Sequence, residues 1–272
     1  MAKVKSGNNM KIGIFDSGLG GLLIAKAIKK EMPEYDYVYL GDTKRVPYGN
    51  RSHDTVYEFT RQGIKFLFKK ENCALIILAC NTASARALRK IQQEYLPKNF
   101  PGRRVLGVII PVAEEVENIK KIGVLGTEGT VNSGTFLKEI KKLNPRAKIY
   151  QVAAPLLVPL VENEGDEFAD PIVGKYLSSI LKKNVQALIL GCTHYPILKN
   201  NFKKILPKSV KIISQDELIP KKLKNYLSRH ADIEKKLSKR GKVKILVTDK
   251  TQSVERLTKA WFGKVRPQLI NL

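Results

Sequence analysis

The chain has 272 residues, 43% of them hydrophobic, and its 49 Lys and Arg outnumber 25 Asp and Glu to give a net charge of +24. No apolar run approaches the roughly 20 residues of a membrane-spanning helix, and the basic, polar N-terminus lacks the apolar segment of a signal peptide. The 3 cysteines form no CxxC pair and the 3 histidines are scattered, which argues against a disulfide framework and a metal cluster. We therefore expect a cytoplasmic protein with no metal and no membrane contact.

The excess of cations allows a loose association with nucleic acid or another acidic surface. The lysines are spread along the chain, however, and aromatic residues make up only 7% of it. Specific binding of nucleic acid depends on Arg and on aromatic stacking, and basic and aromatic residues do not alternate here. We expect the charge to keep the surface solvated rather than to mark a nucleic-acid site.

Short apolar runs alternate with amphipathic stretches along the chain. The pattern predicts strands over residues 11–15, 37–40, 75–79, 104–108, 122–125, 149–153 and 187–190, with one more in the tail over 243–247. It predicts helices over residues 22–31, 54–70, 83–94, 134–143, 172–182 and 196–205. Continuous apolar strands separated by helices indicate parallel sheets in α/β layers.

Two of the strands, with the residues that follow them, occur twice. Residues 11–18 resemble 121–128, and residues 74–82 resemble 187–194 once one residue is gapped, at nearly the same offset. Two repeated strands in the same order indicate two similar halves. We expect two three-layer α/β halves with mostly parallel sheets and the active site in the cleft between them. The expected domains are residues 1–105 plus 214–272 and residues 106–213.

A polar motif directly follows each of several predicted strands. In an open parallel sheet, ligands bind beyond the carboxyl ends of the strands, so these motifs converge on one cleft if the two halves face each other. The motifs are Asp16 with Ser17, Asp42 with Tyr48 and Gly49, Cys80 with Asn81 and Thr82, Thr127 with Thr130, and Cys192 with Thr193 and His194.

Cys80 and Cys192 occupy equivalent points of the repeat, each after a strand and before a predicted helix. The positive end of a helix dipole lowers the pKa of a thiol from about 8.5 and favours the thiolate. His194 is placed to exchange a proton with Cys192 or with a substrate. A single buried cysteine is usually a small packing residue, and Cys73, which precedes a strand and is not followed by a polar motif, is assigned to packing.

The Gly-rich stretch over residues 18–21 does not complete a dinucleotide-binding GxGxxG motif, because Leu23 occupies the position of the third glycine. A tight turn whose backbone N–H groups reach a ligand carboxylate is the simpler interpretation. The chain has no P-loop, and none of its lysines stands out as a Schiff-base residue.

These motifs together resemble those of the glutamate racemases in the aspartate/glutamate racemase superfamily. The matching stretches are residues 13–21, 41–43 with 47–49, 79–84, 155–162 and 191–196. The chain departs from the family pattern at residues 212–217, where an Asp-Ser pair is common, so contacts between the halves are expected to differ there.

The resemblance implies a cofactor-independent enzyme that interconverts L- and D-glutamate and supplies D-glutamate for peptidoglycan. Cys80 and Cys192 would lie on opposite faces of the substrate Cα, the first serving D-glutamate and the second L-glutamate. Asp16 and His194 would assist the thiols, and Asp42 and Glu162 are further possible helpers. The residues that would bind the substrate are Asp16, Ser17, Tyr48, Gly49, Asn81, Thr82, Thr127, Thr130, Thr193 and His194.

Other interpretations remain open. Asp16 and Asp42 can also stabilise turns, and Glu162 can be a plain surface carboxylate. A sister racemase acting on aspartate or another acidic amino acid would share the fold and the cysteines. A DNA- or gyrase-binding protein on a racemase scaffold is an alternative of another class. The resemblance also allows a homodimer.

Overall fold

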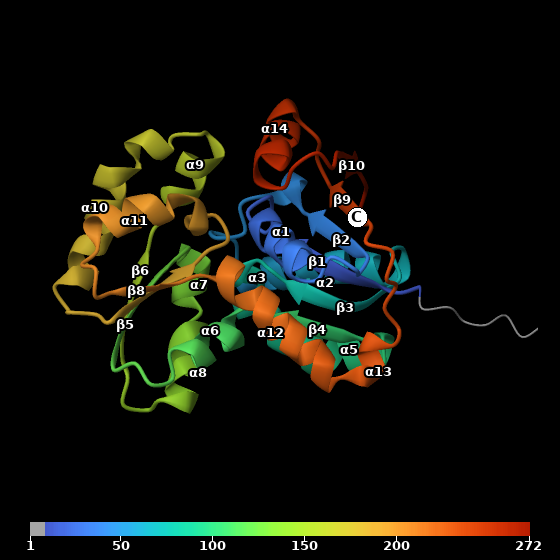
Figure 1. Ribbon diagram of the computed structural model, residues 1–272, viewed down its shortest axis with the longest axis horizontal. Helices are drawn as coiled ribbons and strands as arrows, with labels where there is room; N and C mark the ends of the chain where they lie inside the picture. The colour runs from blue at the N-terminus through green and yellow to red at the C-terminus, as the bar shows by residue number, and fades with distance from the viewer. Residues whose placement is uncertain (1–8) are drawn as a thin grey trace, which may run out of the picture.

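The computed structural model describes residues 9–272, which form two α/β halves side by side (Figure 1). The first sheet has six strands, in the order β10 (Pro267–Leu269), β9 (Val243–Val247), β2 (Tyr37–Gly41), β1 (Lys11–Asp16), β3 (Cys73–Leu78) and β4 (Arg104–Gly107). The second has four, in the order β6 (Lys148–Ala153), β5 (Lys121–Gly126), β7 (Ala187–Gly191) and β8 (Lys211–Ile213). All neighbouring strands in both sheets pair in parallel, which confirms the expected fold class.

The repeat in the sequence corresponds to one topology used twice. β1 lies between β2 and β3, just as β5 lies between β6 and β7, and the fourth strand extends each sheet beyond the third. The C-terminal tail returns to the first half, where β9 pairs with β2 and β10 with β9. The strands β8 and β10 were not predicted, because three residues are too few to show a pattern.

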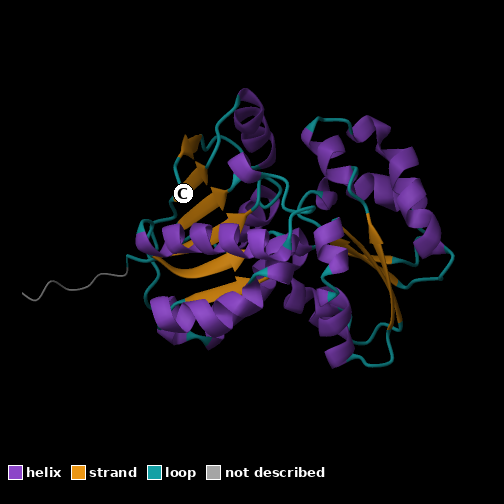
Figure 2. Ribbon diagram, turned by 180° about the vertical axis from the view of Figure 1, so that it is seen from behind, coloured by secondary structure: helices purple, strands orange, loops and turns teal. Residues whose placement is uncertain are grey.

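Helices cover both faces of each sheet, so each half has three layers (Figure 2). In the first half, one face packs against α1 (Leu22–Glu31), α12 (Gln215–Arg229), α13 (Ala231–Glu234) and α14 (Gln252–Trp261). The other face packs against α2 (His53–Lys69), α3 (Asn81–Arg86), α4 (Leu88–Lys90) and α5 (Leu96–Asn99), with the π-helical turn η2 (Ile91–Tyr95) between the last two.

The second half is built in the same way. One face of its sheet packs against α9 (Leu157–Glu162), α10 (Ala169–Leu181) and α11 (Lys199–Ile205), and the other against α6 (Ile109–Glu115) and α8 (Thr135–Leu143). The short helix α7 (Glu128–Asn132) follows β5, and the 3-10 turns are η1 (Thr43–Arg45), η3 (Asp166–Phe168) and η4 (Tyr195–Leu198). Within residues 9–272, no helix is both long and apolar enough to span a membrane.

The central strands β1 and β5 are buried after their first residue, because both of their faces are covered by helices. In β1, Ile12 and Ile14 pack against the helices of one face, whereas Phe15 packs against those of the other. Two predicted helices are interrupted. The segment predicted over 83–94 breaks into α3, α4 and η2, and the segment over 196–205 begins as η4 and becomes α-helical only at Lys199.

Candidate active site

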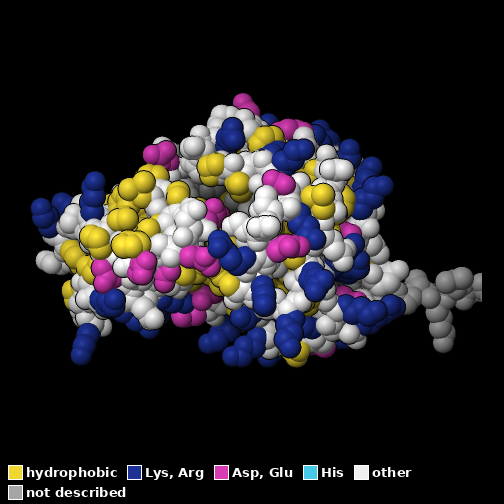
Figure 3. Space-filling view, turned by 90° about the horizontal axis from the view of Figure 1, so that it is seen from above, with side chains coloured by type: hydrophobic (Ala, Val, Ile, Leu, Met, Phe, Trp, Pro, Cys, Tyr) yellow, Lys and Arg dark blue, Asp and Glu magenta, His cyan; other side chains and the backbone are white. Residues whose placement is uncertain are grey.

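A cavity of about 350 Å³ lies between the two halves, at the carboxyl ends of β1, β3, β5 and β7. The space-filling view shows the molecule hollowed between the halves (Figure 3). Both halves contribute to the wall, and both Cys80 and Cys192 line it. The other predicted residues that line it are Ser17, Tyr48, Gly49, Asn81, Thr82, Thr127, Glu162, Thr193 and His194.

Cys80 is the N-cap residue of α3. The backbone N–H of Ala83 donates to its Sγ at 3.4 Å, and the thiol in turn contacts Ser17 Oγ at 3.3 Å. Burial raises the pKa of Cys80 to about 12, and the nearby Asp16 adds to the rise, while the hydrogen bonds with Ser17 and Ala83 oppose it. The expectation of a lowered pKa is therefore wrong for Cys80, because desolvation outweighs the helix N-terminus. At neutral pH Cys80 holds its proton.

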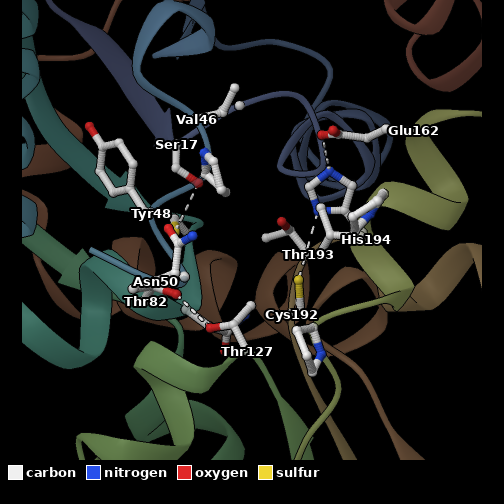
Figure 4. Close-up of a pocket in the computed structure, with 18 of the residues that line it drawn as sticks. Ser17, Val46, Tyr48, Asn50, Thr82, Thr127, Glu162, Cys192, Thr193 and His194 are labelled. Carbon is white, nitrogen blue, oxygen red and sulfur yellow. Dashed lines mark hydrogen bonds and ion pairs between the residues drawn. The ribbon is translucent and has the colours of Figure 1, made fainter. Parts of the chain in front are cut away.

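In the second half, His194 lies between Cys192 and Glu162 and contacts both side chains (Figure 4). The Sγ of Cys192 lies 3.7 Å from His194 Nδ1, and His194 Nε2 lies 2.9 Å from Glu162 Oε1. Burial lowers the pKa of His194, but the hydrogen bonds with Cys192 and Glu162 outweigh it and raise the pKa to about 10. His194 is thus an imidazolium at neutral pH, and its positive charge lies beside the Cys192 sulfur.

The surroundings of Cys192 differ from those expected. The residues after it form the 3-10 turn η4 rather than the start of an α-helix, so the positive charge near Cys192 comes from His194 and not from a helix dipole. The interpretation of Glu162 as a plain surface carboxylate is wrong. Its side chain is 32% exposed, but it is paired with His194 at the cavity wall.

Asp16 lies behind the cavity wall at the end of β1 and is completely buried. Its carboxylate accepts from the backbone N–H of Gly18 at 3.1 Å and from Thr193 Oγ1 of the opposite half at 3.5 Å. Burial raises the pKa of Asp16, although His194 and the N–H groups of Gly18 and Gly21 oppose the rise. Asp16 therefore acts on the two cysteine motifs electrostatically and through Thr193.

Three threonine hydroxyls join the halves at the cavity wall. Thr82 Oγ1 of the first half lies 2.9 Å from Thr127 Oγ1 and 3.2 Å from Thr130 Oγ1, and these two lie 3.1 Å apart. Thr127 also caps α7 by accepting from the N–H of Thr130 at 3.2 Å. Thr82 and Thr127 line the cavity, whereas Thr130 is completely buried beneath them.

Comparison with known proteins identifies the family to which this fold belongs. Residues 23–215 match the family described as Asp/Glu/Hydantoin racemase. A glutamate racemase from Sulfurihydrogenibium sp. is 41% identical over 97% of this chain and 98% of its own length. A glutamate racemase from Aquifex aeolicus is 40% identical, with 96% and 97% covered. The chain belongs to the Asp/Glu/hydantoin racemase family.

A solved structure agrees with this assignment. The glutamate racemase from Francisella tularensis, crystallised in complex with D-glutamate, superposes on this chain with a TM-score of 0.88. The two sequences are 33% identical, and the match covers 97% of this chain and 98% of that one. The resemblance to glutamate racemases is thereby confirmed, and the protein is an isomerase.

Asp42 of the racemase does not line the cavity. It is completely buried and accepts from Tyr48 Oη at 2.5 Å, from Arg45 Nε at 2.6 Å and from Thr248 Oγ1 at 2.8 Å. The hydroxyl of Tyr48 accordingly points away from the cavity (Figure 4). The geometry makes Asp42 a support for the Tyr48–Gly49 loop rather than a group that meets a substrate.

The Gly-rich turn of the racemase makes room for the opposite half. A Cβ on Gly20 would lie 2.5 Å from Thr193 Oγ1 and 2.6 Å from His194 Nδ1. Gly18 lines the cavity, whereas Gly20 and Gly21 do not. The expected contact between this turn and a ligand is therefore limited to Gly18, and the absent side chain of Gly20 allows the Cys192 motif to approach.

Sequence reasoning missed several residues of the wall. These are Val46, Pro47, Asn50, Glu128, Pro155, Val158, Pro159 and Asn163. Most of them lie next to motifs that the sequence had already indicated. This adjacency is the signal that could have identified them. Of the described residues around the cavity none is Lys or Arg, so carboxylates there would meet N–H, hydroxyl, amide and imidazolium groups. Residues 9–272 hold no group of three or more His, Cys, Asp or Glu arranged for a metal ion.

Proposed function

We propose that this racemase interconverts L- and D-glutamate without a cofactor, using Cys80 and Cys192 as its two bases. One observation carries the proposal: two thiols from corresponding points of the two halves line one cavity, each with its own polar partners. The substrate follows from the relatives, since a chain 41% identical over nearly its full length is named glutamate racemase. By the same resemblance, the D-glutamate would supply peptidoglycan synthesis.

In the proposed reaction of L-glutamate, the Cys192 thiolate takes the α-proton and leaves its bonding electron pair on Cα. The Cys80 thiol then gives its proton to the opposite face of Cα. The products are D-glutamate, a Cys192 thiol and a Cys80 thiolate, and the reverse reaction starts from that state. The imidazolium of His194 beside Cys192 and the raised pKa of Cys80 support this starting arrangement.

The cavity wall supports the stabilisation that such a carbanion needs. An amino-acid Cα–H is a very weak acid, so fixed dipoles in a site shielded from water must stabilise the negative charge. Hydroxyl and amide groups of Ser17, Asn81 and Thr127 supply such dipoles, and Val46 and Val158 add apolar surface to the wall. We propose that these groups bind the carboxylates and exclude water around Cα.

The test is racemisation followed by circular dichroism, with L-glutamate and L-aspartate as parallel substrates. We expect the wild-type signal to decay with L-glutamate, and in deuterated water we expect deuterium at Cα of the product. Cys80→Ala and Cys192→Ala should each lower the rate by about 10²–10⁴-fold, the usual contribution of a positioned acid or base.

Cys73→Ala is the matched control, because Cys73 is buried at the start of β3 and does not line the cavity. It should racemise glutamate at close to the wild-type rate. Racemisation that persists in the Cys80→Ala, Cys192→Ala double variant would refute the two-thiol scheme. Decay with L-aspartate alone would replace glutamate with aspartate as the substrate.

A further inference from the structure

Gln215 lies where the chain crosses back from the second half to the first. It is the first residue of α12 and follows β8 with only Ser214 between them. The helix α12 packs on α1, and its N-terminal end lies beside α3 between the halves (Figure 1). The Gln215 side chain is completely buried at this crossing.

The Gln215 side chain contacts the cavity wall through Asn81. Its Nε2 donates to Asn81 Oδ1 at 3.0 Å, although the two residues are 134 positions apart in the sequence. Asn81 follows Cys80 and itself lines the cavity. A carboxamide has one oxygen that accepts and one nitrogen that donates, so a donor held at Oδ1 decides which way the Asn81 amide faces.

The donor end of the Asn81 amide is left without a partner. Its Nδ2 is buried and makes no hydrogen bond with any residue from 9 to 272, which is costly for an amide donor. Asn81 also belongs to a wall that contains no Lys or Arg among its described residues. An unpaired N–H₂ group on a residue of this wall suits a carboxylate, which only accepts hydrogen bonds when ionised.

We propose that Gln215 is a positioning residue that orients the Asn81 carboxamide so that its N–H₂ group serves a carboxylate of the substrate. The proposal rests on the acidic amino-acid substrate proposed above. Because Gln215 lies at the crossing between the halves, the orientation of Asn81 depends on how the halves are arranged. The Gln215 amide leaves its own Oε1 buried without a partner among the described residues, which costs free energy. An apolar side chain would fill the same space without that cost, so packing alone would not require an amide.

The test measures binding without turnover. The chain has 1 Trp, and the ring of Trp261 lies 5.7 Å from that of His194, so its fluorescence reports on the cavity. Racemic glutamate is the probe, because an equilibrium mixture undergoes no net reaction. Gln215→Met should weaken binding about tenfold, the scale of one hydrogen bond to a charged group.

Gln151→Met is the matched control. Gln151 lies in β6, away from the cavity wall, and its Oε1 is also buried without a partner. This variant should bind glutamate as the wild type does. If Gln215→Met does not fold, Gln215→Ser takes its place, because serine is too short to reach Asn81 and adds no apolar bulk.

A second arm separates positioning from packing. In an Asn81→Ala background, Gln215→Met should have almost no further effect on binding, since the group through which it acts is gone. Additive losses in the double variant, or unchanged binding in Gln215→Met alone, would overturn the proposal. A wild type that binds glutamate without racemising it refutes the proposed function but leaves this test intact. A wild type that does not bind glutamate overturns both.

Discussion

Cys80 and Cys192 differ in the charges that surround their sulfurs. Cys80 is buried near Asp16, and only hydrogen bonds with the neutral groups of Ser17 and Ala83 oppose the effect of burial, so its pKa rises to about 12. Cys192 lies beside the imidazolium of His194, which is held by Glu162. The sequence predicted the positions of both thiols, but it could not show this difference, because Glu162 and His194 are 32 residues apart and meet only through packing.

A pH-dependent contribution to stability follows from the raised pKa of His194. The folded protein binds this proton more tightly than the unfolded chain, because the pKa rises from 6.5 to about 10. The stabilisation is therefore fully present below pH 6.5 and is lost as the pH rises through about 10. We expect wild-type stability to fall relative to His194→Asn by at least ~1 kcal/mol over this range, since one pKa unit corresponds to ~1.4 kcal/mol.

The measurement is urea unfolding of both proteins at pH 6.5 and pH 10. Titrating groups outside the contacting set Cys192, His194 and Glu162 affect both proteins alike, so the difference between the two proteins reports on that set. Parallel changes in the two proteins would contradict the assignment of this proton to His194. His53, whose side chain is 59% exposed, offers a control in His53→Asn, which should follow the wild type.

At the scale of elements, the turn between β1 and α1 is set by close contact between the halves. The spacing of its glycines indicated a tight turn, and α1 was predicted over 22–31 and found at Leu22–Glu31. What the spacing could not indicate was that Gly20 faces Thr193 and His194, which come from the other half of the chain.

Gly20→Ala should abolish most of the activity while leaving the fold intact. The new Cβ would fall 2.6 Å from His194 Nδ1, so the imidazole must move. A displacement of about 1 Å in a catalytic group can cost about 10²-fold in rate, and we expect a loss of at least that size in kcat/KM. Steady-state racemisation by circular dichroism measures it.

Gly174→Ala in α10 is the control for Gly20→Ala. Its Cβ would lie 3.9 Å from Ile205, an ordinary contact, and alanine is the better helix former by ~0.5–1 kcal/mol. This variant should keep full activity and unfold at a slightly higher temperature. Normal activity in Gly20→Ala would show that the turn can shift away from His194 and would contradict the close approach.

At the scale of the whole molecule, the charge of +24 is the least explained property. The Lys and Arg side chains are spread over the face in Figure 3, and none of the described residues lining the cavity is one of them. Many are paired with carboxylates at the surface, as Lys222 is with Glu114 at 2.7 Å. Binding of nucleic acid or gyrase, the expected domain boundaries and a homodimer stay predictions.

Salt should stabilise the folded protein. Most surface ion pairs contribute only ~0–1 kcal/mol each, whereas the excess positive charge repels itself across the whole compact state. At ~0.1 M salt the Debye length is about 10 Å, so this repulsion is screened. We expect the thermal midpoint to rise by a few degrees, about 2–4 °C for each kcal/mol gained.

The measurement is thermal unfolding at low and at near-physiological sodium chloride. A variant with Lys26→Glu, Lys65→Glu and Lys98→Glu lowers the net charge at three exposed positions and should show a weaker salt dependence. A midpoint that falls with salt would show that the attractive pairs outweigh the net repulsion.

The sequence by itself determined the parts of this racemase that depend on local pattern and repetition. Apolar strands covered on both faces, the doubled order of strands, and polar motifs at strand ends follow from residues close together in the chain. They were sufficient to predict the fold, the cavity and most of its wall. Tertiary structure alone decided which distant residues meet, as Gln215 meets Asn81. It also decided the protonation of Cys80 and His194, because desolvation and partners from other elements set those pKa values.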